Sequence, residues 1–308
     1  MDYEDHVFKE VKNASAPIPE SEVDITQDCL DILLTIVGLL GIITEIFLIY
    51  IICYYRKLHT TINIYLINWS IANIGAIVMT ISCFPIYSTF KNLSLMVMCF
   101  YLSIPFALYF NVIFFMIMLT LDWWFSAFWP NPLQKFREYT KYIIATIWAL
   151  SAMYFVTSAS LCSLSTYYLI FHYTLPVLFT ILIVLVVGLH VIRIIKKHKT
   201  GFEYYSVNLL YIPTGFVCCW FMNWINIFIQ YYSYAYYTLS DLILFMHPIL
   251  NFVLLVMYDA DFKACFFKII EGFPCFCFKY HRSNESFNNA NAAIPEPSAL
   301  VDNGERYF

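Results

Sequence analysis

The sequence predicts an all-α membrane protein, a bundle of seven transmembrane helices followed by a short amphipathic eighth helix. Three observations predict it: 61% of the 308 residues are hydrophobic, 12% are charged, and the mean hydropathy is +0.69. A soluble domain of this length does not have so apolar a composition. Seven stretches are apolar and long enough to cross about 30 Å of hydrocarbon; they are residues 32–54, 63–84, 95–123, 142–161, 168–194, 209–228 and 239–256.

Each of these stretches is expected to be an α-helix, because hydrocarbon offers the backbone no water and its polar groups must bond within the segment. Lysine and arginine concentrate after the first, third, fifth and seventh stretches, whereas the opposite loops contain only Lys91. The positive-inside rule places the basic segments in the cytoplasm and the N-terminus outside the cell. Three regions follow: an extracellular arm (1–30), a membrane domain (31–258), and an amphipathic helix with a cytoplasmic tail (259–308).

Both terminal regions carry sequence signals for covalent modification. The arm is acidic and expected to be disordered, and Asn13-Ala14-Ser15 is a glycosylation sequon on the outer side. After the last apolar stretch, Cys275 and Cys277 follow an aromatic, amphipathic segment. Cysteines beside a membrane in this context are candidates for palmitoylation, and reduced, unmodified thiols are the alternative.

The third apolar stretch ends in an unusual group, Asp122-Trp123-Trp124. A longer run of residues, at 55–73, reads Tyr-Arg-Lys-Leu-His-Thr-Thr-Ile-Asn-Ile-Tyr-Leu-Ile-Asn-Trp-Ser-Ile-Ala-Asn. Trp148, Pro176 and Trp220 lie in the fourth, fifth and sixth stretches. With these marks, residues 30–280 resemble a class A (rhodopsin-like) G-protein-coupled receptor, above all the chemokine and peptide branch.

The resemblance makes the cytoplasmic face the most divergent part of the chain. Asp122-Trp123-Trp124 stands where such receptors carry Asp-Arg-Tyr, so Trp123 replaces the arginine that contacts the G protein, and an indole has no charge. The Asn-Pro-x-x-Tyr motif is reduced to Asn251-Phe252, and His247-Pro248 is a rival alignment. Pro213 is expected to bend the sixth helix in place of the family's later proline.

Four polar residues are expected to form an interior cluster. The resemblance aligns Glu45 with a helix-one asparagine and Asn73 with a helix-two aspartate, so carboxylate and amide are exchanged. A buried carboxylate is costly unless it is protonated or paired. We expect Glu45 near Asn73, His247 or Asn251, with either a trapped Na⁺ or a protonated carboxyl that serves packing alone.

The outer half of the bundle is expected to hold a ligand pocket that is mainly aromatic. Asn223 and Asp241 supply its polar groups, and Asp241 together with the acidic arm favours a basic ligand. The expected ligand-binding residues are Tyr101, Tyr109, Trp220, Asn223, Trp224 and Asp241. Cys99 and Cys162 lie on the oxidising side, and the same pair is a mark of the family resemblance, which implies a disulfide between them.

These features imply a plasma-membrane receptor for an extracellular peptide or chemokine, in a host cell if the gene is viral, as the Asn- and Ile-rich composition and the altered motifs suggest. Its partners would be membrane lipid, a heterotrimeric G protein or arrestin, and other receptors in heteromers. The alternatives are a non-signalling decoy or scavenger, a membrane scaffold, and a transporter or channel. No enzyme, metal-binding or nucleic-acid-binding signature is present in the sequence.

Overall fold

The computed structural model describes residues 20–89, 95–128, 130–161, 166–200, 210–229 and 234–272. Within these ranges the chain is almost entirely helical and contains no strand. Among the described residues, six helices contain a stretch long and apolar enough to cross a membrane: α2 (Glu20–Tyr54), α3 (Thr61–Thr89), α4 (Leu95–Phe128), α6 (Thr140–Leu161), α7 (Thr166–Thr200) and α9 (Tyr234–Tyr258). The chain is therefore a multi-pass helical membrane protein.

The remaining described elements are shorter. They are η1 (Arg56–Leu58), α5 (Pro130–Glu138), α8 (Tyr211–Ile229) and α10 (Ala260–Gly272). Helix α8 corresponds to the sixth apolar stretch of the sequence, and it packs against α9, α7 and α4. The chain divides into residues 1–267 and 268–308, and every contact discussed below lies within the first of these units.

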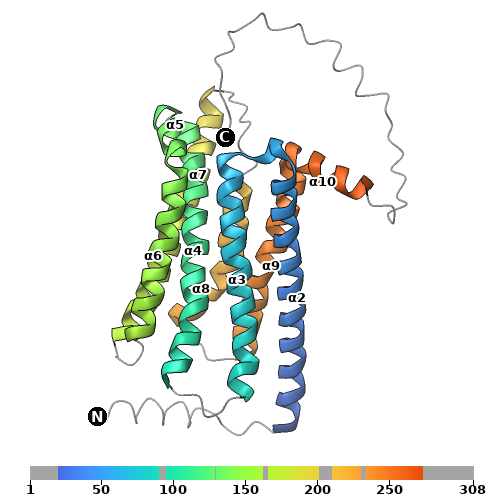
Figure 1. Ribbon diagram of the computed structural model, residues 1–308, viewed down its shortest axis with the longest axis vertical. Helices are drawn as coiled ribbons and strands as arrows, with labels where there is room; N and C mark the ends of the chain where they lie inside the picture. Colours follow the sequence, from blue (N-terminus) through green and yellow to red (C-terminus); the bar gives the residue numbers. More distant parts are fainter. Residues whose placement is uncertain are drawn as a thin grey trace, which may run out of the picture. The chain divides into compact units, whose positions relative to one another are not determined.

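The long helices run side by side, with neighbours in the sequence usually neighbours in space (Figure 1). Helix α3 packs on α2 and α4, α4 also packs on α6 and α7, and α9 closes the arrangement by packing on both α2 and α8. Helix α5 lies at the end where α2 gives way to η1 and α3 (Figure 1). We call this end of the bundle the η1 end.

Two glycines allow α2 to approach its neighbours closely. A side-chain carbon at Gly38 would lie 2.6 Å from Cδ1 of Ile81 on α3, and one at Gly41 would lie 3.4 Å from the backbone oxygen of Phe245 on α9. Small residues at helix interfaces replace the hydrophobic driving force that lipid removes, because they permit close backbone packing. A side chain at Gly38 would require Ile81 to change its position, whereas a Cβ at Gly41 would only make van der Waals contact with α9.

The connections at the η1 end are stabilised by side-chain caps. The Asn63 backbone N–H donates to Thr60 Oγ1 at the start of α3, and Asn63 Nδ2 donates to the Leu58 carbonyl oxygen at 2.7 Å. At the start of α10, Asp259 Oδ1 accepts the backbone N–H groups of Asp261 and Phe262 at 3.0 and 2.9 Å. Both arrangements satisfy N–H or C=O groups that a helix end would leave unpaired.

The structure corrects several expected boundaries. Helix α2 begins at Glu20, so the last part of the arm, expected to be disordered, is helical. Helix α7 continues to Thr200, so the lysines expected in a loop belong to a helix. Pro213 lies in the first turn of α8, where a missing N–H costs little, and does not bend the helix in its middle. Helix α5, absent from the prediction, begins with Pro130 and is too short and polar to show apolar periodicity.

Candidate functional site

A buried carboxylate and amide meet at the interface of α2 and α3. Asn73 Nδ2 donates to Glu45 Oε1 at 2.8 Å, and both side chains are almost completely buried. The two residues come from facing helices and lie 28 positions apart in the sequence. Helix packing thus brings together the pair that the family resemblance placed in contact, with carboxylate and amide on opposite helices from those of the family.

The other two members of the interior cluster lie on α9. His247 Nδ1 lies against the carbonyl oxygen of Leu244, to which it can only donate, and Trp220 Nε1 lies 3.4 Å from the same ring nitrogen. Both side-chain amide atoms of Asn251 and the Oδ1 of Asn73 are buried without a protein partner among the described residues. Buried polar atoms of this kind require ordered water or an ion. The side-chain oxygens of Asn73 and Asn251 can therefore each accept a hydrogen bond from water.

Aromatic side chains of α4, α7 and α8 pack together inside the bundle, further from the η1 end than Trp123. The Trp220 ring meets Tyr109 edge to face at a centroid distance of 5.2 Å, and Trp224 stacks on Phe179 at 5.2 Å. The Tyr109 hydroxyl also bonds to Thr80 Oγ1 at 2.8 Å. Three of the expected ligand-binding aromatics are thus brought together, and Phe179 joins them.

Polar groups accompany these aromatics. Asn223 Nδ2 donates to Asp241 Oδ1 at 2.7 Å, which ties α8 to α9. Tyr101 lies half-buried about two turns before Tyr109 on α4. The expected polar anchors are therefore bonded to each other, and Asn223 holds the Asp241 carboxylate in place. A carboxylate held in this way suits a cationic group through charge, and the aromatic rings suit one through their faces.

At the η1 end, Asp122 forms an ion pair that the sequence did not predict. Arg137 of α5 donates to both carboxylate oxygens, Nε to Oδ1 at 3.2 Å and Nη2 to Oδ2 at 3.0 Å. The Asp122 side chain is 0% exposed, whereas that of Arg137 is 40% exposed. The two-pronged geometry is the strong form of this interaction, and it fixes α5 against the end of α4.

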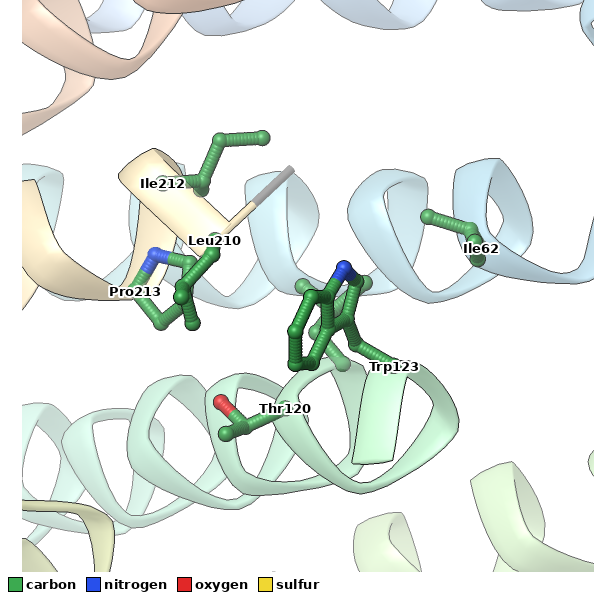
Figure 2. A pocket seen from close by; sticks show the side chains of 7 residues that line it. Ile62, Thr120, Trp123, Leu210, Ile212 and Pro213 are labelled. Atoms are coloured by element: carbon green, nitrogen blue, oxygen red, sulfur yellow. The ribbon is translucent and has the colours of Figure 1, made fainter. Parts of the chain in front are cut away.

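Trp123 follows Asp122 but enters an apolar environment. It forms a buried cluster with Leu189 of α7 and Leu210 at the start of α8, and Trp124 packs against this cluster. A small cavity of about 20 Å³ lies beside its ring, lined also by Ile62, Leu119, Thr120, Ile212 and Pro213. Figure 2 shows the indole between the helix carrying Ile62 and the start of α8. The position that the family resemblance aligns with an arginine is thus occupied by an indole in apolar packing.

A larger polar cavity of about 240 Å³ lies at the same end of the bundle. Its walls come from η1, the start of α3, α5 and the start of α10, and its charged side chains are Lys57, Arg137, Asp259 and Asp261. Lys57 Nζ lies 2.6 Å from Asp261 Oδ1, and the hydrogen bond to this carboxylate raises the pKa of the lysine. The pair is exposed on both sides, so it contributes little to stability.

Several predicted residues lie outside the described ranges: Asn13, Cys162, Cys275 and Cys277. Cys99 is disulfide-bonded, and its predicted partner Cys162 lies outside the described residues, so the pairing stays a prediction. Cys29 on α2 is a free thiol. Among the residues that the structure places, no group of three or more His, Cys, Asp or Glu side chains is arranged to hold a metal ion.

Two residues of these sites were not predicted from the sequence: Arg137, which pairs with Asp122, and Phe179, which stacks on Trp224. Arg137 was one of several cations in a predicted loop, and Phe179 was one of 29 phenylalanines. For Arg137 a signal existed, because a carboxylate at a helix end such as Asp122 needs a cation once it is buried. No comparable signal distinguished Phe179 from other apolar residues of α7.

The chain was compared with known proteins by family and by sequence. No protein-family model matches it, and no curated protein matches it.

Proposed function

We propose that the chain is a seven-transmembrane receptor of the class A type, nearest to the chemokine and peptide branch, at the plasma membrane with its N-terminus outside. In this proposal α8 also crosses the membrane as the sixth of seven helices, and α10 is the amphipathic helix that follows the bundle. The ligand is an extracellular basic peptide or chemokine. The protein couples to its cytoplasmic partners atypically, because Trp123 occupies the arginine position.

The observation that carries the proposal is the hydrogen bond between Glu45 and Asn73 at 2.8 Å. The family resemblance pairs these two positions, which are far apart in the sequence. Their contact supports the alignment with the family, because a helical bundle of a different fold would not be expected to pair these two positions. A second long-range contact agrees with it: Trp148 Nε1 donates to Asn68 Oδ1 at 3.2 Å, between two further residues on which the resemblance depends.

The ligand class is inferred from the aromatic group of α4, α7 and α8 together with Asp241. Apolar walls with a few convergent polar groups are typical of ligand pockets. The carboxylate favours a cationic side chain or amine, and the acidic arm extends the same charge preference. A basic peptide satisfies both features better than an acidic or neutral ligand.

A decoy or scavenging receptor, acting alone or in heteromers, is the second candidate, and the environment of Trp123 favours it. The indole lies in an apolar cluster, and its neighbour Asp122 already pairs with Arg137. The η1 end therefore presents no arginine at the position where the family contacts its G protein. Such a receptor would bind and internalise its ligand without activating a G protein.

The test compares the wild type with Trp123→Arg in cells that carry a panel of G-protein activation sensors, at matched surface levels and without ligand. Trp123→Phe serves as the matched control, because it keeps an apolar ring and adds no charge. Wild-type activity above an empty vector supports an atypically coupling receptor. Silence in the wild type with a signal in Trp123→Arg supports the decoy.

If neither the wild type nor Trp123→Arg activates a G protein, ligand binding becomes the test of the receptor proposal. The wild type and Asp241→Asn would then be compared for binding of a panel of basic chemokines and peptides at the cell surface. We expect the substitution to weaken binding at least about tenfold, because a charge-assisted contact in a water-poor pocket contributes more than a neutral one. Equal binding to both, or binding to neither by any ligand, would contradict the receptor proposal.

A further inference from the structure

The start of α8 is held at the η1 end by contacts with three other helices, none of which is an ion pair. The first contact is apolar. Trp123 of α4, Leu189 of α7 and Leu210 pack together, and all three are at most 5% exposed. A tryptophan buries more apolar surface than any other side chain, so this is a strong attachment for the end of a helix.

The second contact is aromatic and includes α9. The rings of Tyr211 on α8 and Tyr258 on α9 are stacked, with centroids 4.6 Å apart and an interplanar angle of 22°. The Arg193 guanidinium of α7 lies 6.0 Å from the centroid of the Tyr211 ring. A guanidinium over a ring face attracts it without a carboxylate partner. Tyr211 thus joins the ends of α7, α8 and α9.

The third contact is a hydrogen bond one turn further along α8. The Thr214 hydroxyl donates to the Leu210 carbonyl oxygen at 2.8 Å, and this uses its single proton. His190 Nε2 of α7, 2.9 Å from the same hydroxyl, therefore donates to it. The donor direction is thus determined, and the bond ties the first turns of α8 to α7.

We propose that these three contacts act together as a latch without an ion pair that keeps the η1 end of the bundle closed, so that opening requires an indole to leave its packing site. The latch closes α8 onto α4 through Trp123, onto α9 through Tyr258, and onto α7 through Arg193 and His190. The inference concerns how the bundle closes and does not depend on a ligand or on coupling to a G protein.

Amide hydrogen exchange of the full-length protein in lipid nanodiscs tests the latch. We compare the wild type with Trp123→Ala and with the control Phe221→Ala, which removes an exposed ring from α8. We expect exchange at residues 215–219 to rise about tenfold or more in Trp123→Ala, because local opening sets the exchange rate. Phe221→Ala should exchange as the wild type does, and residues 240–245 of α9 should stay protected in every variant.

Two further measurements separate a latch from general destabilisation. Free indole, which fits the space that Trp123→Ala creates, should restore slow exchange at residues 215–219. Tyr258→Phe should retain the ring stack with Tyr211, and exchange at residues 215–219 should stay as slow as in the wild type. Tyr258→Leu should remove the stack, and exchange there should become faster. Raising the salt from about 0.05 to about 1 M should change wild-type exchange by less than about twofold, because the packing of Trp123 is apolar and salt weakens only the Arg193 contact.

The proposal would be overturned by unchanged exchange in Trp123→Ala, or by faster exchange spread equally over residues 215–219 and 240–245. A strong dependence of wild-type exchange on salt would also contradict it, since that would indicate an ionic attachment. The receptor proposal is unaffected by any of these outcomes, because it is tested by ligand and sensor measurements.

Discussion

Asp122 and Arg137 form a pair in which the two partners differ in burial, and this difference predicts unequal effects of mutation. Arg137→Ala leaves a fully buried carboxylate without a partner, which we expect to cost about 3 kcal/mol or more of unfolding free energy. Asp122→Asn removes the buried charge itself, and the half-exposed guanidinium can reach water, so we expect a loss of about 1 kcal/mol. Thermal unfolding of the purified protein in detergent would measure both.

The double variant completes this comparison. Asp122→Asn combined with Arg137→Ala should be close to Asp122→Asn alone, because the second change no longer strands a charge. Additive losses in the double variant would show that the two residues do not act as a pair.

Glu45 allows its hydrogen bond and its charge to be separated. Glu45→Gln keeps an oxygen for Asn73 Nδ2, so we expect unfolding free energy to change by less than about 1 kcal/mol. Glu45→Ala should cost about 3 kcal/mol, because it leaves a cavity and an unpaired buried amide. If the site holds Na⁺, replacing K⁺ by Na⁺ should raise the unfolding temperature of the wild type and not that of Glu45→Gln.

The opposite pattern at Glu45 is equally informative. A loss in Glu45→Gln as large as that in Glu45→Ala would mean that the negative charge is required for folding. No response of the wild type to Na⁺ would indicate that the carboxyl serves packing alone.

At the scale of the element, the start of α10 depends on one side chain. Asp259 accepts two backbone N–H groups of its first turn, and it also places a negative charge at the positive end of the helix. Asp259→Ala should lower the free energy of local unfolding by about 1 kcal/mol. Hydrogen exchange at residues 263–267 would rise accordingly, and Asp259→Ser, which retains a capping oxygen, should restore most of the protection.

If Asp259→Ser exchanges as fast as Asp259→Ala at residues 263–267, the capping role of Asp259 is contradicted. The result would then favour Lys57 and Asp261, which join η1 to the same turn, as the main support of the helix start.

At the scale of the whole molecule, the number of crossings determines where the chain ends lie. In the described part of the chain six helices are long and apolar enough to cross a membrane, and if α8 crosses as proposed, the two ends fall on opposite sides. We therefore expect Asn13 to be glycosylated in cells and an epitope tag added after Phe308 to be detected only after permeabilisation. Removal of glycan by an endoglycosidase and antibody staining of intact cells would measure the two ends.

An even number of crossings would place both ends on the same side. Staining of the tag on intact cells that also carry a glycan at Asn13 would therefore contradict α8 as a membrane-spanning helix.

The sequence by itself determined the class of this protein and its helical stretches, because a backbone in hydrocarbon must bond internally and only long apolar segments can remain there. It also predicted the Glu45 and Asn73 contact, through a family resemblance. Tertiary structure alone decided that Asp122 pairs with Arg137, that Trp123 packs on Leu189 and Leu210, and that Tyr211 stacks on Tyr258. These contacts join residues of different helices, and local patterns do not specify which faces of those helices meet.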